Sequence, residues 1–265
     1  MKDLENIQGS RVYGRRLTKP LTKTSEARLR EYFPKYSISL EGGQVDYTKL
    51  FGYNPREVWL EIGFGKGEHL ISQAKANPDV GFIGCEPYIN GVSGLVDHMV
   101  RDNVTNIRFF MDDARLLMDA TKKQSVSRAF ILFPDPWRKK RHYKRRIVSA
   151  GNLTILAEIL KDGAQLRIGT DHHDYCRWIL ARLMEDINFN WNSSHPDEWH
   201  KRSADWPQTR YEKKALAVGR KSTYLTFQRK PRKPEGLYLI KNLKSQKIAL
   251  YICPSESYEI VNFGR

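Results

Sequence analysis

Between Val58 and Ile187, five short β-rich runs alternate with amphipathic segments, and this alternation restricts the fold more than any other feature of the chain. The β-rich runs are VWLEI (58–62), GFIGCE (81–86), NIRFFM (106–111), RAFILF (128–133) and QLRIG (165–169). The stretches GEHLISQAKA, NGVSGLVDHMV, NLTILAEIL and YCRWILARLMEDI repeat apolar residues at spacings of three and four, which is typical of helices. This order predicts a mostly parallel sheet with helices on both faces and ligands bound beyond the carboxyl ends of the strands.

The regions that flank this pattern divide the chain into three parts. Residues 1–40 are basic and lack apolar periodicity before Leu29, so they predict an arm that ends in a short helix. The run STYLTFQR, after Arg220, predicts one more strand, antiparallel at or near the sheet edge. The segment KPRKPEG, with two prolines and a glycine, is typical of a linker. We therefore expect a catalytic domain at 41–229 and a C-terminal extension at 230–265.

The charge balance indicates a polyanionic partner. The chain has 45 Lys and Arg against 30 Asp and Glu, a net charge of +15, which favours nucleic acid. A membrane is not expected, because no apolar run approaches the roughly 20 residues that span a bilayer. The start, MKDLENIQGS, has no apolar stretch of a secretory signal, so we expect a cytoplasmic protein. Widely separated cysteines and histidines without metal-ligand spacing predict no metal site.

The first β-rich run leads into a glycine-rich turn and then a helix. Glycines at 63, 65 and 67 allow the backbone to turn sharply and to approach a ligand closely. A dinucleotide fingerprint would require its third glycine at position 68, where this chain has Glu68. A carboxylate at the start of a helix would repel a pyrophosphate, so the turn disfavours a dinucleotide cofactor.

Three acidic residues at successive strand ends favour a different cofactor. Glu61 precedes Gly63, where it could receive the ammonium group of S-adenosylmethionine, which carries no phosphate. Glu86 closes the second strand, where an acidic side chain can accept hydrogen bonds from ribose hydroxyls. Asp113 follows the third strand, at a position from which such folds commonly reach the adenine amine. With Gly63 and Gly65, these residues predict a Rossmann-like, class I S-adenosylmethionine-dependent methyltransferase fold.

Further motifs carry a close resemblance to a known family. They are EIGFGKGEHL, PDPWRKKRHYKRR, GTDHHDY and TRYEKKALAVGR, and with the spacing of Glu61, Glu86, Asp113 and Asp135 they cover roughly residues 10 to 229. In these motifs the chain resembles the bacterial tRNA (guanine-N7-)-methyltransferases, which modify the variable-loop guanine at position 46 of tRNA. The resemblance implies transfer of a methyl group from S-adenosylmethionine to N7 of that guanine, giving 7-methylguanosine.

The resemblance also implies roles for individual residues. It marks Asp135 as the catalytic residue and as one that lines the cofactor site. It implies that a second group contacts the RNA substrate: Lys139, Asp171, Thr209, Arg210, Tyr211 and Glu212. Alternatives stay open, since Lys139 could lie on a solvated face, Asp171 could cap the following helix and Tyr211 could fill the core.

Two parts of the chain depart from the family pattern. The stretch after TRYE has Ala215 and Val218-Gly-Arg220 where many members carry Gly and His. The segment after Lys230 has no family counterpart, and an extra RNA contact, a packing element and an accidental extension all remain open. Local loop geometry and the role of the extension therefore do not follow from the resemblance.

The chemistry of guanine N7 agrees with these residue types. N7 has an in-plane lone pair and no proton, so methyl transfer needs no general base and yields a cationic base. Catalysis then requires linear alignment of the reacting atoms in a site that tolerates positive charge. Asp135 could accept from guanine N1 and N2 and stabilise that charge as it develops.

Three rival readings remain: another nucleic-acid methyltransferase, an RNA-binding protein without catalysis, and a dinucleotide-dependent dehydrogenase. The PDPW and TRYE motifs argue against the first, the four acidic residues against the second, and Glu68 against the third. We expect tRNA as partner and no obligate protein partner, with either a monomer or a homodimer.

Overall fold

The computed structural model of the chain describes residues 19–232, 237–241, 248–252 and 259–261. The chain divides into two compact units, Met1–Lys230 and Pro231–Arg265. Residues 1–18 of the expected arm and 233–236 of the expected linker lie outside the described residues. The division of the chain into an arm, a catalytic domain and a C-terminal extension remains a prediction.

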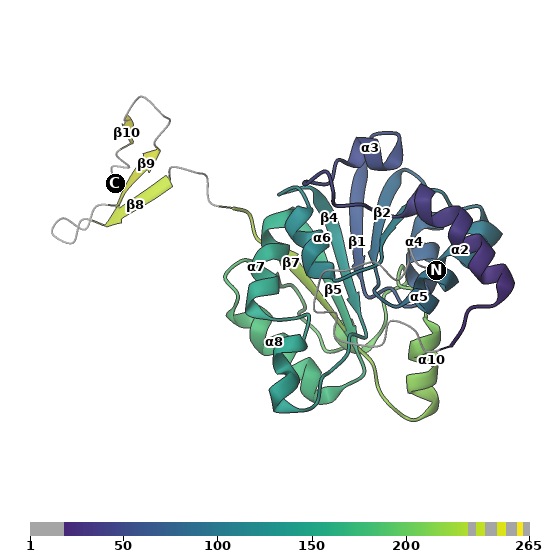
Figure 1. The fold of residues 1–265 in the computed structure, drawn as a ribbon. Coiled ribbons are helices and arrows are strands. Elements are labelled where there is room, and N and C mark those ends of the chain that lie inside the picture. Colours follow the sequence, from purple (N-terminus) through teal and green to yellow (C-terminus); the bar gives the residue numbers. More distant parts are fainter. Residues whose placement is uncertain (1–18, 233–236, 242–247, 253–258, 262–265) are drawn as a thin grey trace. The chain divides into compact units, whose positions relative to one another are not determined.

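A seven-stranded sheet with the order β3-β2-β1-β4-β5-β7-β6 forms the centre of the first unit (Figure 1). Its strands are β1 Glu57–Ile62, β2 Val80–Cys85, β3 Ile107–Phe110, β4 Val126–Leu132, β5 Leu160–Thr170, β6 Phe189–Trp191 and β7 Thr223–Arg229. Strands β1 to β5 are parallel, and β7 is antiparallel to both β5 and β6. The predicted mostly parallel sheet and the additional antiparallel strand near its edge are confirmed. Strand β6, at the edge itself, was not predicted.

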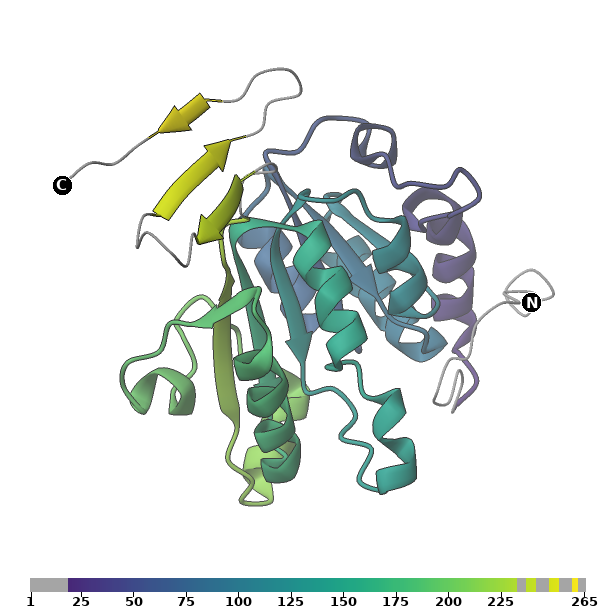
Figure 2. The ribbon, with the colours of Figure 1, turned by 90° about the vertical axis from the view of Figure 1, so that its left-hand side faces the viewer.

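Helices cover both faces of this sheet, as predicted: α2, α4 and α5 lie on one side, and α6, α7 and α8 on the other (Figures 1 and 2). The helices in the described part of the first unit are α2 Lys23–Tyr36, α3 Tyr47–Phe51, α4 Glu68–Ala76, α5 Ile89–Asp102, α6 Ala114–Ala120, α7 Ala150–Ile159, α8 His173–Glu185, α9 Asp197–His200 and α10 Arg210–Ala217, with a 3-10 helix, η1, at Lys140–Arg145. Each face buries its own hydrophobic core against the sheet.

The alternation of side chains along β1 separates these two cores. Val58, Leu60 and Ile62 join the core under α6, α7 and α8, whereas Trp59 joins the core under α4 and α5. Burial of each of these side chains stabilises the fold by roughly 1.5–3 kcal/mol. Because side chains alternate with a period of two, Glu61 points to the face that α4 covers.

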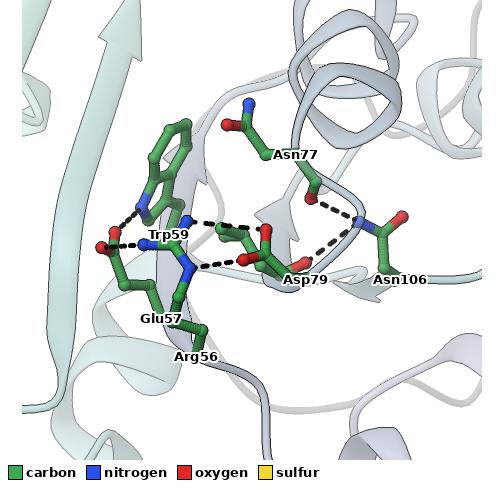
Figure 3. A network of polar contacts seen from close by, with 7 residues as sticks. Arg56, Glu57, Trp59, Asn77, Asp79 and Asn106 are labelled. Carbon is green, nitrogen blue, oxygen red and sulfur yellow. Dashed lines mark hydrogen bonds and ion pairs between the residues drawn. The ribbon is translucent and has the colours of Figure 1, made fainter.

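Polar contacts fix the amino ends of β1 and β2 (Figure 3). The Arg56 guanidinium forms an ion pair with Asp79 and donates to Glu57, whose other oxygen accepts from Trp59 Nε1 at 2.6 Å. The side-chain amide of Asn106 donates to the carbonyl of Asn77 at 3.1 Å. These contacts hold the sheet at the end opposite to the carboxyl ends of its strands.

The second unit holds a three-stranded antiparallel sheet with the order β10-β9-β8. Its strands are β8 Leu237–Lys241, β9 Ile248–Ile252 and β10 Glu259–Val261. The apolar runs LYLI and KIALYICP of the C-terminal extension correspond largely to β8 and β9.

Candidate active site

The glycine-rich turn between β1 and α4 depends on backbone conformations that favour glycine. Gly63, Gly65 and Gly67 have φ values of +77°, +58° and +79°, which a residue with a Cβ adopts only with strain. A Cβ at Gly67 would also lie 2.5 Å from Leu95 Cδ1, whereas around Gly63 and Gly65 there is open space. The turn therefore exposes backbone to a cavity beyond the end of β1.

Glu86, at the end of β2, faces this cavity. Its carboxylate accepts from the backbone amides of Gly65 at 2.8 Å and Tyr88 at 3.1 Å. Burial, together with the nearby charges of Asp135 and Glu61, raises the pKa of Glu86 to about 7, although these hydrogen bonds lower it. Each oxygen accepts from one backbone amide, and a carboxylate oxygen can accept more than one hydrogen bond, so Glu86 is suited to accept hydroxyl donors from a ligand.

Glu61 is paired with a residue that the sequence analysis missed. Its Oε2 lies 2.7 Å from Nδ1 of His69, and both side chains are almost completely buried. His69 lies on the first turn of α4, which packs on the face to which Glu61 points. The imidazole fixes the direction of the Glu61 carboxylate, and both residues line the cavity.

Asp113 has two contacts within its own segment. It caps α6 by accepting from the backbone amide of Arg115 at 2.9 Å, and it forms an ion pair with the Arg115 side chain. An aspartate is a favoured N-cap residue. Asp113 still lines the cavity beside Ala114.

The segment after β4, Phe133-Pro-Asp-Pro-Trp137, has an unusual backbone. Phe133 and Trp137 both lie in the left-handed region, with φ of +51° and +43°; large side chains rarely adopt this conformation, so it stores strain. Asp135, between them, is exposed toward the cavity, and the protein around it raises the pKa of its carboxyl by desolvation.

The TRYE motif forms the start of α10, which the sequence analysis did not predict as a helix. Thr209 caps α10 by accepting from the amide of Glu212 at 3.2 Å, and Glu68 accepts from the amide of Arg210. Tyr211 is half exposed, and its ring lies 5.2 Å from that of Phe133. The contact of Glu68 therefore joins the glycine-rich turn to α10.

Glu212 points away from the cavity. Its side chain is 2% exposed, and its carboxylate accepts from the hydroxyl of Tyr224 and lies 3.7 Å from the guanidinium of Arg202. This placement favours a role in which Glu212 holds α10 in position over the direct RNA contact that the resemblance implies.

Asp171 follows β5 and forms an ion pair with Arg220, with 2.6 Å between Oδ2 and Nη1. Helix α8 is capped by His172, whose Nδ1 accepts from the amide of Tyr175. The alternative that Asp171 caps this helix is therefore wrong. Lys139 is exposed directly before η1 and, like Asp171 and Glu212, does not line the cavity.

The cavity has a volume of about 640 Å³ at the carboxyl ends of the parallel strands. It brings together residues that are far apart in the sequence: Glu61, Gly63, Gly65, Glu86, Asp113, Asp135, Thr209, Arg210 and Tyr211. Its volume is in the range of small-molecule and cofactor sites. The carboxylates of Glu61, Glu86, Asp113 and Asp135 around the glycine backbone suit a cationic, phosphate-free nucleoside such as S-adenosylmethionine.

Two further observations concern the described parts of the chain. None of the helices in these parts is both long and apolar enough to cross a membrane. Within the same residues, no three His, Cys, Asp or Glu side chains gather as a metal ion would require.

Comparisons with known proteins agree with this geometry. A family model described as "Putative methyltransferase" matches residues 55–225. The chain is 42% identical over 229 residues to a tRNA (guanine-N(7)-)-methyltransferase of Rhodospirillum rubrum, covering 85% of this chain and 90% of that protein. It is 45% identical over 224 residues to the enzyme of the same name from Ruegeria sp., covering 82% and 87%.

The fold is shared with a solved methyltransferase structure. The crystal structure of the 16S rRNA methyltransferase KamB has a TM-score of 0.52 and 15% identity, covering 71% of this chain and 95% of that chain. The predicted class I methyltransferase fold is thereby confirmed.

Proposed function

Because the chain belongs to the tRNA (guanine-N(7)-)-methyltransferase family, we propose that it transfers a methyl group from S-adenosyl-L-methionine to N7 of a guanine in tRNA. One observation supports this most strongly: a single cavity is lined by the strand-end carboxylates, by Asp135 and by the start of the TRYE helix. A cofactor site and a nucleobase site therefore adjoin. We take the variable-loop guanine, position 46, as the target.

On the cofactor side, Glu86 would accept from the ribose hydroxyls, Glu61 would receive the ammonium group, and Asp113 lies where the adenine is expected. The backbone of Gly63 and Gly65 leaves the space that the nucleoside needs. When bound, the cofactor supplies an electrophilic methyl group on a sulfonium sulfur. His69 would orient Glu61 toward the ammonium group, because its Nδ1 lies at hydrogen-bond distance from that carboxylate.

On the reaction side, the chain needs no general base, because guanine N7 carries no proton. Asp135 accepts from N1 and N2 of the base, which distinguishes guanine from adenine and stabilises the positive charge that forms. Partial desolvation strengthens this interaction, since charges attract more strongly away from water. The left-handed residues on either side hold Asp135 in one place, so that little reorganisation is required.

On the RNA side, Tyr211 offers a half-exposed ring beside Phe133, which suits stacking on an unpaired base. Arg210 and Thr209 at the start of α10 and the exposed Lys139 are placed to contact RNA phosphates. Asp171 is paired with Arg220 at the same end of the sheet and lies near Tyr211. We propose that Glu212 acts by holding α10.

We further propose that the protein acts in the cytoplasm, where its tRNA substrate lies, and without an obligate protein partner. Light scattering of the purified protein with and without tRNA would distinguish monomer from homodimer.

The direct test is transfer of labelled methyl groups to unmodified tRNA, followed by digestion to nucleosides. Label in 7-methylguanosine supports the proposal, and label in another nucleoside contradicts it. Calorimetry with S-adenosylmethionine and NAD in parallel tests the dehydrogenase alternative, since only the first is expected to bind.

A further inference from the structure

The Lys and Arg side chains of the basic run from Arg138 to Arg146 differ in exposure. Five of the seven are exposed, namely Arg138, Lys139, Lys140, Arg141 and Lys144. Arg145 is partly buried and lines the cavity. Arg146, the last of the run, is only 3% exposed. A guanidinium so deeply buried is poorly placed to contact a phosphate of RNA.

Aromatic rings surround the Arg146 guanidinium. Its central carbon lies 3.7 Å from the ring centre of Tyr143, 4.7 Å from that of Trp178 and 4.9 Å from that of Tyr175. No carboxylate in the described residues forms an ion pair with it. A buried cation is costly unless rings and hydrogen bonds compensate for the lost water, so a cation kept here is expected to have a specific role.

The hydrogen bond of Arg146 reaches the segment that carries Asp135. Its Nε donates to the carbonyl oxygen of Pro136 at 2.9 Å. Pro134 and Pro136 have no N–H of their own, so the backbone on both sides of Asp135 cannot donate a hydrogen bond. A bond to a carbonyl is therefore one of the few ways in which the protein can fix this loop.

The loop also requires fixing at both ends. At its start, the amide of Phe133 donates to the carbonyl of Gly169 at 2.7 Å. At its end, Trp137 has a left-handed backbone with φ of +43°. Such conformations cost of order 1–3 kcal/mol each and persist only where the surroundings enforce them.

We propose that Arg146 is a positioning residue, which holds the Pro136 carbonyl and thereby keeps Asp135 at the mouth of the cavity. The inference rests on the proposed function only in taking Asp135 as catalytic. It divides the basic run by role: the exposed cations face RNA, and Arg146 together with Tyr143, Tyr175 and Trp178 builds the catalytic loop.

The test compares Arg146→Lys with Arg229→Lys as a matched control. Arg229 is also buried and donates from Nε to a backbone carbonyl, that of Ala157, at 2.9 Å, but it lies outside the cavity lining. We expect Arg146→Lys to lower the single-turnover methylation rate at least about tenfold at saturating tRNA, because lysine lacks the planar fork that can bond Pro136 while stacked on the rings. The dissociation constant for tRNA and its salt dependence should stay unchanged. Arg229→Lys should leave the rate unchanged.

A second readout does not depend on activity. Hydrogen exchange of the Phe133 amide, which donates to the Gly169 carbonyl at the start of the loop, should become faster in Arg146→Lys and in Tyr143→Leu, which removes the nearest ring, but not in Arg229→Lys. The inference is overturned if exchange stays the same in both variants, or if Arg146→Lys lowers the salt dependence of tRNA binding and not the rate. If the wild-type protein does not methylate tRNA, the proposed function is contradicted. The exchange measurement then still tests whether Arg146 positions the loop.

Discussion

Glu86 combines burial with a proposed role in cofactor binding, and this combination predicts that binding depends on pH. A pKa raised from 4.5 to about 7 means that the folded, cofactor-free protein prefers the protonated form. The resulting contribution to stability is present below about pH 4.5 and is lost as the pH rises through 7. Ribose hydroxyls donate to the ionised form, so cofactor binding should draw a proton off Glu86.

We therefore expect the affinity for S-adenosylmethionine to rise about tenfold between pH 6 and pH 8, as the ionised fraction rises across a pKa near 7. Calorimetry in buffers of different ionisation enthalpy should show proton release near pH 6.5. Glu86→Gln should weaken binding and abolish both effects. Proton release that persists in Glu86→Gln would assign the titration to another group, such as Asp135.

Asp135 is expected to matter for the reaction far more than for RNA affinity. Asp135→Asn should nearly abolish methyl transfer and leave tRNA binding close to wild type, because phosphate contacts dominate affinity. Single-turnover kinetics and a binding titration on the same preparations measure the two effects. A variant that retains a tenth or more of the wild-type rate contradicts the catalytic role.

At the scale of single residues, the sequence located those side chains whose position follows from the end of a strand. Glu61, Glu86, Asp113 and Asp135 all line the cavity, since strand ends of a parallel sheet meet at one edge. The burial of Glu212 and Arg146 could not be predicted, because it depends on Tyr224, Tyr175 and Trp178, which come from other segments. His69 could have been found from its place on the first turn after the glycines, opposite Glu61.

Among the elements, η1 presents the exposed cations that are available for RNA. Replacing Lys140, Arg141 and Lys144 together with Gln should reduce the slope of log affinity against log salt by roughly 2 to 3, since each lost phosphate contact contributes about 0.7 to 0.9. Filter binding of tRNA at several salt concentrations measures this slope. The same slope in the triple variant and the wild type would mean that η1 faces away from the RNA. Arg146 is left intact, because its loss would disturb the catalytic loop.

The elements that the sequence predicted are those with strong periodicity. The five β-rich runs correspond to β1 to β5 within a few residues, and α4, α5, α7 and α8 cover the predicted amphipathic stretches. Helices α6 and α10 are short, with seven and eight residues, so they offer little more than two turns of pattern. They are defined by their caps, Asp113 and Thr209, both of which the sequence analysis had assigned to ligand binding instead. Strand β6 has three residues, too few for an alternation to be recognised.

For the whole molecule, the division near Lys230 predicts tolerance of truncation. Residues 231–265 form a compact unit of their own, and such units commonly fold independently of their neighbours. A chain that ends at Arg232 retains the bond from the Lys230 amide to the Asn188 carbonyl. Its melting temperature should lie within about 3 °C of wild type, a change equivalent to less than about 1 kcal/mol. A larger decrease would show that the extension packs as part of the catalytic unit.

The most direct test of the account uses two tRNA transcripts that differ only at position 46, guanine in one and adenine in the other. With labelled S-adenosylmethionine, we expect the protein to place 7-methylguanosine in the first transcript and no label in the second. Equal labelling of both transcripts, or label in a nucleoside other than 7-methylguanosine, would contradict the proposal that this cavity methylates N7 of the variable-loop guanine.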